Sequence, residues 1–300
     1  PAVAPAGPAL FGVPALPADA PEAQRRLSLA QLIASPDNPL TARVLVNRVW
    51  QYTFGTGIVD TPSDFGINGG HPSHAQLLDW LATRLIDQNW SIKQLQRRLL
   101  SSATFRQASV SRREAARIDA ECRLLWRFPP RRLSAEAIRD SLLLVSGQMN
   151  RRMGGPSFSF FEKTGNIFEK KQPRVEFGPE GWRRMIYGAK VRLEYVGVFG
   201  VFDCPDASQM APKRTVSTSA GQALSLLNSP FVIRQAGFLA DVASREVATV
   251  RRQIEVAAGR ALCRPLRADE MRVLTEVAEQ QGLMHACRIL LNLNEFVFIQ

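Results

Sequence analysis

Helix boundaries constrain this chain more than any other feature, because start and stop signals frame most of its apolar segments. Asn38-Pro39 is a typical helix start, an N-cap residue followed by proline at the first helical position. Gly55 ends the amphipathic segment that follows. Ser91 and Ser134 stand in the same N-cap place before two more such segments. The sequence therefore predicts a mainly α fold, a multi-helix domain.

Between the helical segments lies an irregular centre. Residues 150–183 mix Gly, Pro, aromatic and charged residues without a period, as in a long ordered loop. Met185–Tyr187 and Val191–Phe202 alternate weakly and suggest one short β-hairpin. We expect helices at 23–34, 39–54, 74–88 (capped by Ser73), 92–103, 111–120, 135–149, 222–227, 231–243, 246–260, 269–280 and 283–291.

Composition and pattern together suggest the organisation of the chain. The Ala-, Pro- and Gly-rich residues 1–22 are expected to be a linker. A helical block (23–150), the irregular segment (151–213) and a second helical block (214–300) would form one integrated domain. Hydrophobic residues make up 45% of the chain, enough for a substantial core. Its apolar runs are too short for a transmembrane segment.

Charge indicates an anionic partner. The net charge is +11, from 38 Lys and Arg against 27 Asp and Glu. Only six of the basic residues are lysines, which leaves 38 − 6 = 32 arginines. The four cysteines form no CxxC pair and no haem-attachment motif.

Eight strings stand in order along the chain and carry a family resemblance. They occupy 36–66, 74–82, 101–109, 123–150, 154–157 (GGPS), 202–206 (FDCPD), 214–232 (RTVSTSAGQALSLLNSPFV) and 290–299. In this order they resemble the planctomycete-specific C-terminal domain, catalogued as domain of unknown function fifteen-fifty-three.

The resemblance implies a setting but no reaction. Members of the family commonly form the C-terminal part of large exported proteins, downstream of a planctomycete cytochrome c module. The chain is thus expected in the periplasm or cell envelope, with companion modules of the same polypeptide as partners. It would carry no cofactor itself, because haem c belongs to the neighbouring module.

The predicted helix 39–54 carries a first candidate site. Arg43, Asn47 and Trp50 share one face, and a guanidinium beside an amide and an indole suits a carboxylate, sulfate or sugar. The alternative is structural, with Arg43 and Asn47 hydrogen-bonded to the loop at 58–66. Asp64 in that loop would then be the arginine's natural partner.

The string FPPRRLSAEAIRDSLL carries a second. Arg132, Glu136 and Asp140 follow a spacing of four residues, and Glu136 and Arg139 a spacing of three. Carboxylates at such spacing can share a proton or ligate a metal. A salt-bridge network with the nearby arginines is the competing interpretation.

A third candidate is a basic surface around residues 183–214. GGPS could hold an anion through its N–H groups or simply form a tight turn. His71 and His74 have metal-like spacing, but too few further ligands exist and we predict no metal. The expected basic surface comprises Arg183, Arg184, Lys190, Arg192, Lys213 and Arg214.

Three functions follow from these patterns. The first is a non-catalytic module that binds companion modules and an anionic partner such as an acidic polysaccharide. The second is a carbohydrate-active enzyme domain that uses carboxylates as acid and base, with Asp64, Glu136, Asp140 and Asp203 as candidates. The third, nucleic-acid binding, rests on the high isoelectric point alone, since no nucleic-acid signature is present.

Overall fold

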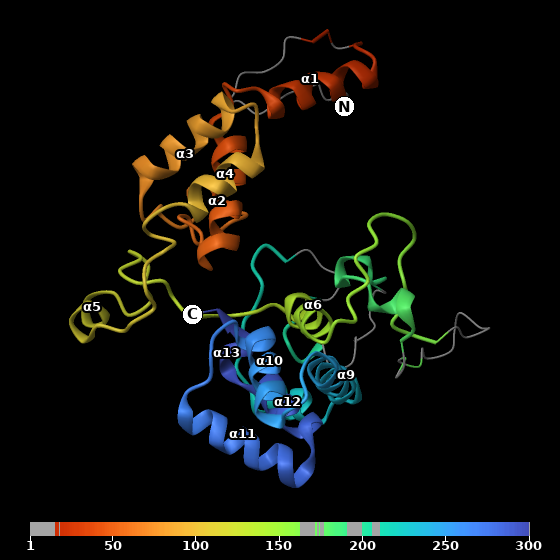
Figure 1. The fold of residues 1–300 in the computed structure, drawn as a ribbon. Helices are drawn as coiled ribbons and strands as arrows, with labels where there is room; N and C mark the ends of the chain where they lie inside the picture. The colour runs from red at the N-terminus through yellow and green to blue at the C-terminus, as the bar shows by residue number, and fades with distance from the viewer. Residues whose placement is uncertain are drawn as a thin grey trace. The chain divides into compact units, whose positions relative to one another are not determined.

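The computed structural model shows two compact units, Pro1–Pro129 and Pro130–Gln300, each with its own hydrophobic core. In Figure 1 the first unit runs from red to yellow and the second from green to blue. The residues that the structure describes are 16–17, 19–162, 172, 174, 177–190, 200–205 and 211–299.

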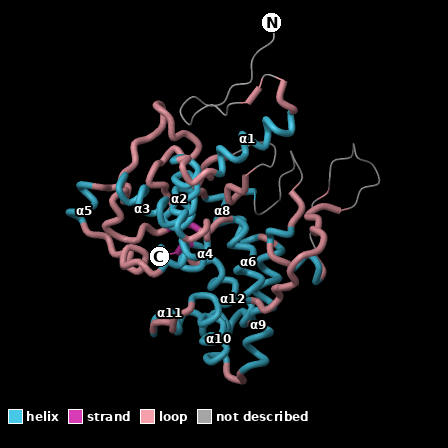
Figure 2. Tube along the Cα trace, turned by 90° about the horizontal axis from the view of Figure 1, so that it is seen from above, coloured by secondary structure: helices cyan, strands magenta, loops and turns pink. Residues whose placement is uncertain are grey.

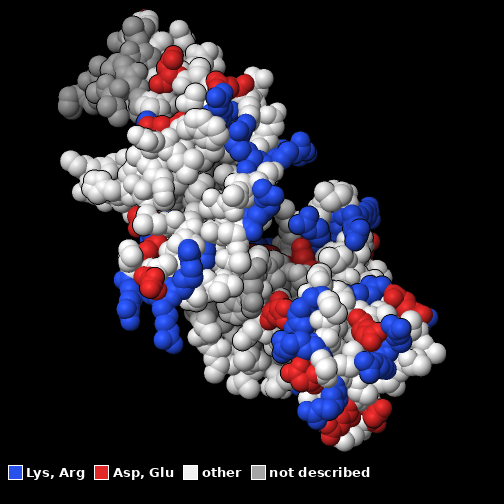
Figure 3. Space-filling model, turned by 60° about the vertical axis from the view of Figure 1, so that its left-hand side comes forward, with Lys and Arg blue, Asp and Glu red and all other residues white. Residues whose placement is uncertain are grey.

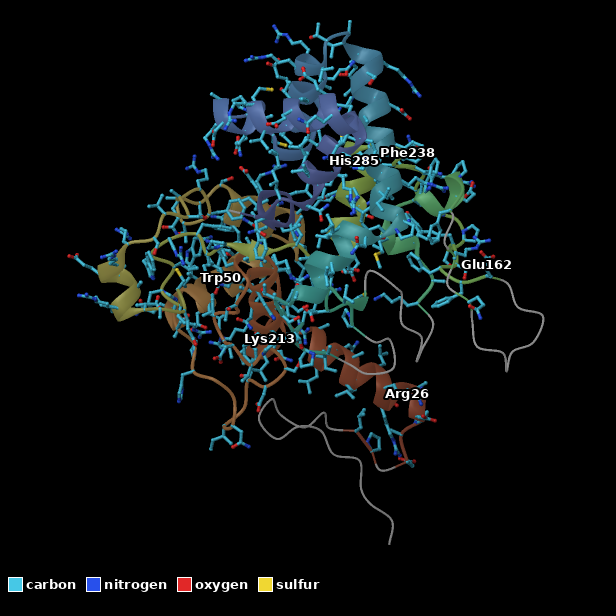
Figure 4. The ribbon with its side chains drawn as sticks, turned by 90° about the horizontal axis from the view of Figure 1, so that it is seen from below. Arg26, Trp50, Glu162, Lys213, Phe238 and His285 are labelled. Atoms are coloured by element: carbon cyan, nitrogen blue, oxygen red, sulfur yellow. The ribbon has the colours of Figure 1, made fainter. Side chains whose placement is uncertain are left out.

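The first unit is built around α2, which packs against α3 and α4. Its core gathers apolar faces of all three helices, including Val46, Leu85 and Leu95. Trp50 of α2 also lies within this group of helices (Figure 4). The helices of this unit are α1 (Glu22–Ala34), α2 (Pro39–Phe54), α3 (Ala75–Asp87), α4 (Ile92–Leu100) and α5 (Arg113–Ile118).

The helix caps follow the sequence in most places. The Asn38 side chain accepts a hydrogen bond from the Leu40 N–H, and Ser91 caps α4 through the Gln94 N–H. The expected cap at Ser73 is wrong, because α3 begins after His74 and the Ser73 hydroxyl donates to the Ile58 carbonyl instead.

The second unit centres on α12, which packs against α9, α10 and α11. Cys287, Leu290 and Leu291 of α12 are fully buried, and burial raises the pKa of the Cys287 thiol to about 12. The helices of this unit are α6 (Ala135–Val145), η2 (Pro179–Trp182), η3 (Met185–Tyr187), α8 (Ala220–Asn228), α9 (Pro230–Glu246), α10 (Val250–Leu262), α11 (Ala268–Gln281), α12 (Leu283–Asn292) and α13 (Asn294–Val297).

One short antiparallel strand pair accompanies these helices in the described part of the chain. β1 (Arg131–Arg132) pairs with β2 (Phe298–Ile299), with Arg131 opposite Ile299, beside the C-terminus in Figure 2. The mainly α class is confirmed, but the strand expected at Met185–Tyr187 is wrong. Met185–Tyr187 forms a turn of 3₁₀ helix, and residues 191–199 lie outside the described residues.

No helix among the described residues is both long and apolar enough to cross a membrane.

Candidate functional site

The Arg43–Asn47–Trp50 stripe of α2 contributes mainly to the first unit's own structure. Asn47 is fully buried; its Nδ2 donates to the Val59 carbonyl and its Oδ1 accepts from the Val59 N–H, both at 2.9 Å. Trp50 is buried against Phe54. The predicted bond to the 58–66 loop is therefore confirmed for Asn47.

For Arg43 the expected bond to the same loop is wrong. Arg43 Nε donates to Asp79 Oδ1 of α3 at 2.6 Å, so the guanidinium ties α2 to α3. Asp64 accepts from the Gly66 N–H at 2.9 Å and forms no arginine ion pair within the described residues.

A basic surface on the first unit was missed at the sequence level. Residues 88–113 contain six basic side chains and no acidic one, a run visible in the sequence. Three of the six lie on α4, which Leu95 and Leu99 anchor into the core from the opposite side. We call Lys93, Arg97 and Arg98, together with Trp80 and Arg84 of α3, the α4 basic face.

Trp80 forms the aromatic part of the α4 basic face. It is 44% exposed, and the guanidinium carbons of Arg98 and Arg84 lie 5.2 and 5.7 Å from its ring centroid. Arg84 also pairs with Asp87 at 3.3 Å. Within the described residues, Lys93, Arg97 and Arg98 have no acidic partner, so their positive charge is directed to solvent.

Lys and Arg side chains appear differently on the two units in Figure 3. On the face shown, several blue side chains follow one edge of the first unit, whereas red and blue side chains alternate over the second.

In the second unit, Glu136 on the first turn of α6 is held by cations. Arg214 forms a bidentate pair with it, with N–O distances of 2.6 and 3.1 Å. Lys190 Nζ lies 4.0 Å from Glu136 Oε1. Burial alone would raise the pKa of Glu136, but the hydrogen bond and charge of Arg214, with the charge of Lys190, bring it below the ordinary value.

The Asp203 carboxylate is also held by an arginine, together with a serine. Arg132 Nη2 donates to Asp203 Oδ2 at 2.6 Å, and the Ser217 N–H and hydroxyl also donate to this carboxylate. Gln222 Nε2 donates in turn to the Ser217 carbonyl. Residues of the strings FDCPD and RTVSTSAGQ are thus bonded to residues at or just before the start of α6. These contacts join strings that lie far apart in the sequence.

Asp140 and Arg139 are neighbours on α6 with different surroundings. Asp140 accepts from the Met185 N–H at 2.7 Å and from Arg184 at 3.4 Å. The predicted Glu136–Arg139 pair is wrong, since Arg139 is fully buried and donates to the main-chain carbonyls of Gly181 and Arg183. Desolvation lowers the pKa of Arg139 to about 10.

Arg183 decides between the two interpretations of GGPS. The Arg183 guanidinium donates to the carbonyls of Arg152, Gly154 and Pro156, so this loop turns carbonyl oxygens inward around a cation. The N–H of Gly154 donates to the Tyr187 hydroxyl at 2.8 Å. GGPS is therefore a turn that surrounds an arginine, and Arg183 is buried.

The predicted basic surface at 183–214 consequently loses most of its members to internal contacts. Arg184 pairs with Asp140, while Lys190 and Arg214 face Glu136. Lys213 is exposed, and Arg192 lies outside the described residues.

Among the described residues, no three His, Cys, Asp or Glu side chains lie together as metal ligands would. His74 Nδ1 lies 3.0 Å from the Ser73 hydroxyl at the entrance to α3.

These features define a mainly helical protein with two cores, an exposed basic face and several internally paired arginines. A family model described as a protein of unknown function (PSD1, DUF1553) matches residues 25–278. The chain belongs to this family, which confirms the resemblance carried by the eight strings. No curated protein and no solved structure matches the chain.

Proposed function

We propose that this chain is a binding module of a larger exported protein, and that its α4 basic face binds an anionic polymer such as an acidic polysaccharide. The observation that carries the proposal is the group of Lys93, Arg97 and Arg98, three cations without an acidic partner in the described residues. Companion modules of the same polypeptide would be its other partners.

The physical basis is the difference between paired and unpaired charge. A cation already in an ion pair must give up that contact before it binds a new anion, whereas an unpaired one only exchanges solvent and counterions. Trp80 adds a partly exposed flat ring beside the charges. An aromatic ring next to guanidinium groups suits a sugar ring that carries a carboxylate or sulfate.

The enzyme hypothesis is weakened by the surroundings of its proposed carboxylates. Glu136, Asp140 and Asp203 each accept charged hydrogen bonds from arginine. A general acid at neutral pH needs a raised pKa, whereas the hydrogen bond and charge of Arg214 bring the pKa of Glu136 below its ordinary value. Asp64, the fourth candidate, accepts from the Gly66 N–H on a loop.

The proposal is tested by titrating the chain with polygalacturonate, following Trp fluorescence at low and at physiological salt. We expect binding that weakens with salt. The triple variant Lys93→Gln, Arg97→Gln, Arg98→Gln should lose about tenfold or more in affinity, at roughly 1.4 kcal/mol per factor of ten.

A matched control removes three exposed cations of the second unit that already have acidic partners. Arg251→Gln, Arg252→Gln, Arg267→Gln should bind polygalacturonate as the unchanged chain does. An equal loss of affinity in both triple variants would mean that only net charge matters for binding. That result would overturn the assignment to the α4 basic face. Tight binding to duplex DNA with none to polygalacturonate would favour the nucleic-acid hypothesis instead.

A further inference from the structure

Cys204 lies beside a lysine at unusually close range. Lys190 Nζ is 2.6 Å from Cys204 Sγ, shorter than an ordinary N–H···O hydrogen bond although sulfur is the larger atom. Glu136 Oε1 lies 3.8 Å from the sulfur and 4.0 Å from the lysine nitrogen. The thiol, the amine and the carboxylate thus converge on one place in the second unit.

This site has the features that an oxidation-sensitive thiol needs. Lys190 contacts the sulfur directly, and Arg214 bonds to the same Glu136 carboxylate that lies beside it. Both Lys190 and Cys204 are partly exposed, so a small oxidant can reach them. By contrast, Cys122 and Cys287 are buried, and exposed Cys263 has no lysine contact among the described residues.

From this geometry we propose that Lys190 and Cys204 form a covalent, oxygen-bridged cross-link, Nζ–O–Sγ, when the protein meets hydrogen peroxide. The N···S separation is close to the span of one bridging oxygen, so little movement is needed. A direct N–S bond would instead require the two atoms to come much closer.

The reaction balances with two molecules of peroxide. In the first step the Cys204 thiolate attacks peroxide, the O–O bond breaks, and a sulfenic acid and water form after uptake of a proton. In the second, an N–O bond joins Nζ to the sulfenic oxygen. One N–H and one O–H bond break, and the second peroxide takes up two electrons and these two protons to give two waters.

The sum is one thiol, one amine and two peroxides converted into the bridge and three waters. Lys190 must lose a proton before its nitrogen can react, and water can take up that proton at this partly exposed side chain.

The test uses the full chain with Cys263→Ser, which removes the exposed thiol. After peroxide treatment, intact mass spectrometry should show a gain of one oxygen and a loss of two hydrogens. Trypsin should no longer cleave after Lys190, and peptide 185–192 should be found joined to peptide 193–213. Dithiothreitol should restore the original mass and the cleavage.

Two variants keep the proposal falsifiable. Cys204→Ser should abolish the mass change, and Lys190→Arg, which keeps the charge, should give only oxygen adducts on Cys204. The chain that keeps both Lys190 and Cys204 provides the decisive measurement. If peroxide gives sulfinic acid at Cys204 and trypsin still cleaves normally after Lys190, the cross-link is overturned. Loss of two hydrogens without a gain of oxygen would show a direct N–S bond and overturn the bridging oxygen.

Discussion

The two units use arginine in contrasting ways. In the first unit, Arg97 and Arg98 project from α4 into solvent beside an exposed tryptophan. In the second, Arg139 and Arg183 are buried and donate to main-chain carbonyls. The same residue type therefore contributes an external charge on α4 of the first unit and an internal scaffold around α6 of the second.

This difference shows why net charge alone is a poor guide to binding surfaces. A buried guanidinium loses its hydration, and only hydrogen bonds or opposite charges compensate for that loss. Such an arginine adds to the formal charge of +11 but cannot also bind a partner. An arginine with no acidic neighbour keeps its charge available and costs the fold little.

The largest effect is expected from removing the buried scaffold at Arg139. Arg139→Met leaves the Gly181 and Arg183 carbonyls without their donor, so the free energy of unfolding of the second unit should fall by about 3–5 kcal/mol. Urea unfolding with hydrogen exchange read separately for each unit checks this. Arg139→Lys should also destabilise, because lysine lacks the planar fork. Unchanged stability in both variants would mean that the buried arginine is dispensable.

In the first unit, the neutral side chain of Asn47 is buried as Arg139 is in the second. Its substitution tests whether the first unit also depends on a buried polar side chain. Asn47→Ala removes both hydrogen bonds to Val59, and the free energy of unfolding of the first unit should fall by about 2–4 kcal/mol. The same hydrogen-exchange experiment should show faster exchange at Val59. A loss confined to the second unit would contradict this assignment.

A partly buried ion-pair cluster of the second unit predicts a dependence of its stability on pH. Arg264 bonds to both Glu270 and Glu295, and hydrogen bonds from Arg264 hold the pKa of Glu270 at about 2, below its usual 4.5. A carboxylate with a depressed pKa stabilises the folded state above its unfolded pKa, and this contribution disappears as pH falls through the folded pKa.

Arg264→Gln should therefore lower the melting temperature at pH 7. The difference from the unchanged chain should shrink between about pH 4.5 and 2, as measured by thermal unfolding in a pH series. As a control, Arg267→Gln should give a smaller difference, because its side chain is more exposed than that of Arg264. A difference that stays constant down to pH 2 would exclude the ion-pair origin.

The smallest effect on stability is expected at the α4 basic face. Arg97→Gln should change the free energy of unfolding by no more than about 0.5 kcal/mol, since its side chain has no partner in the described residues. Urea unfolding alongside the polygalacturonate titration separates the two roles. A large loss of stability would show that this arginine belongs with the buried scaffold.

Local signals in the sequence predicted most of the helices. α2 spans the expected 39–54, and α12 spans 283–292 against an expected 283–291, because caps and apolar periodicity act within a few residues. The partners of the charged residues were not predictable in this way. Glu136 meets Arg214, 78 residues further along the chain, and no local spacing indicates such a contact.

Two other differences have the same physical origin. The strand expected at 185–187 was placed by alternation alone, whereas this segment forms a turn of 3₁₀ helix and the observed strand pair joins residues 131–132 to 298–299. GGPS has the composition of an anion-binding loop, yet the direction of its peptide groups depends on Arg183, distant in sequence. Of the candidate site, only the acid-free run 88–113 was open to prediction.

The pairing of β1 with β2 has a consequence for how the second unit can be rearranged. Because Arg132 lies opposite Phe298, two segments at either end of this unit are neighbours in space. A short peptide could join them, and the chain could be opened at an exposed loop such as that between α9 and α10. The second unit is thus a good subject for circular permutation, and for insertion as a whole into a loop of another protein.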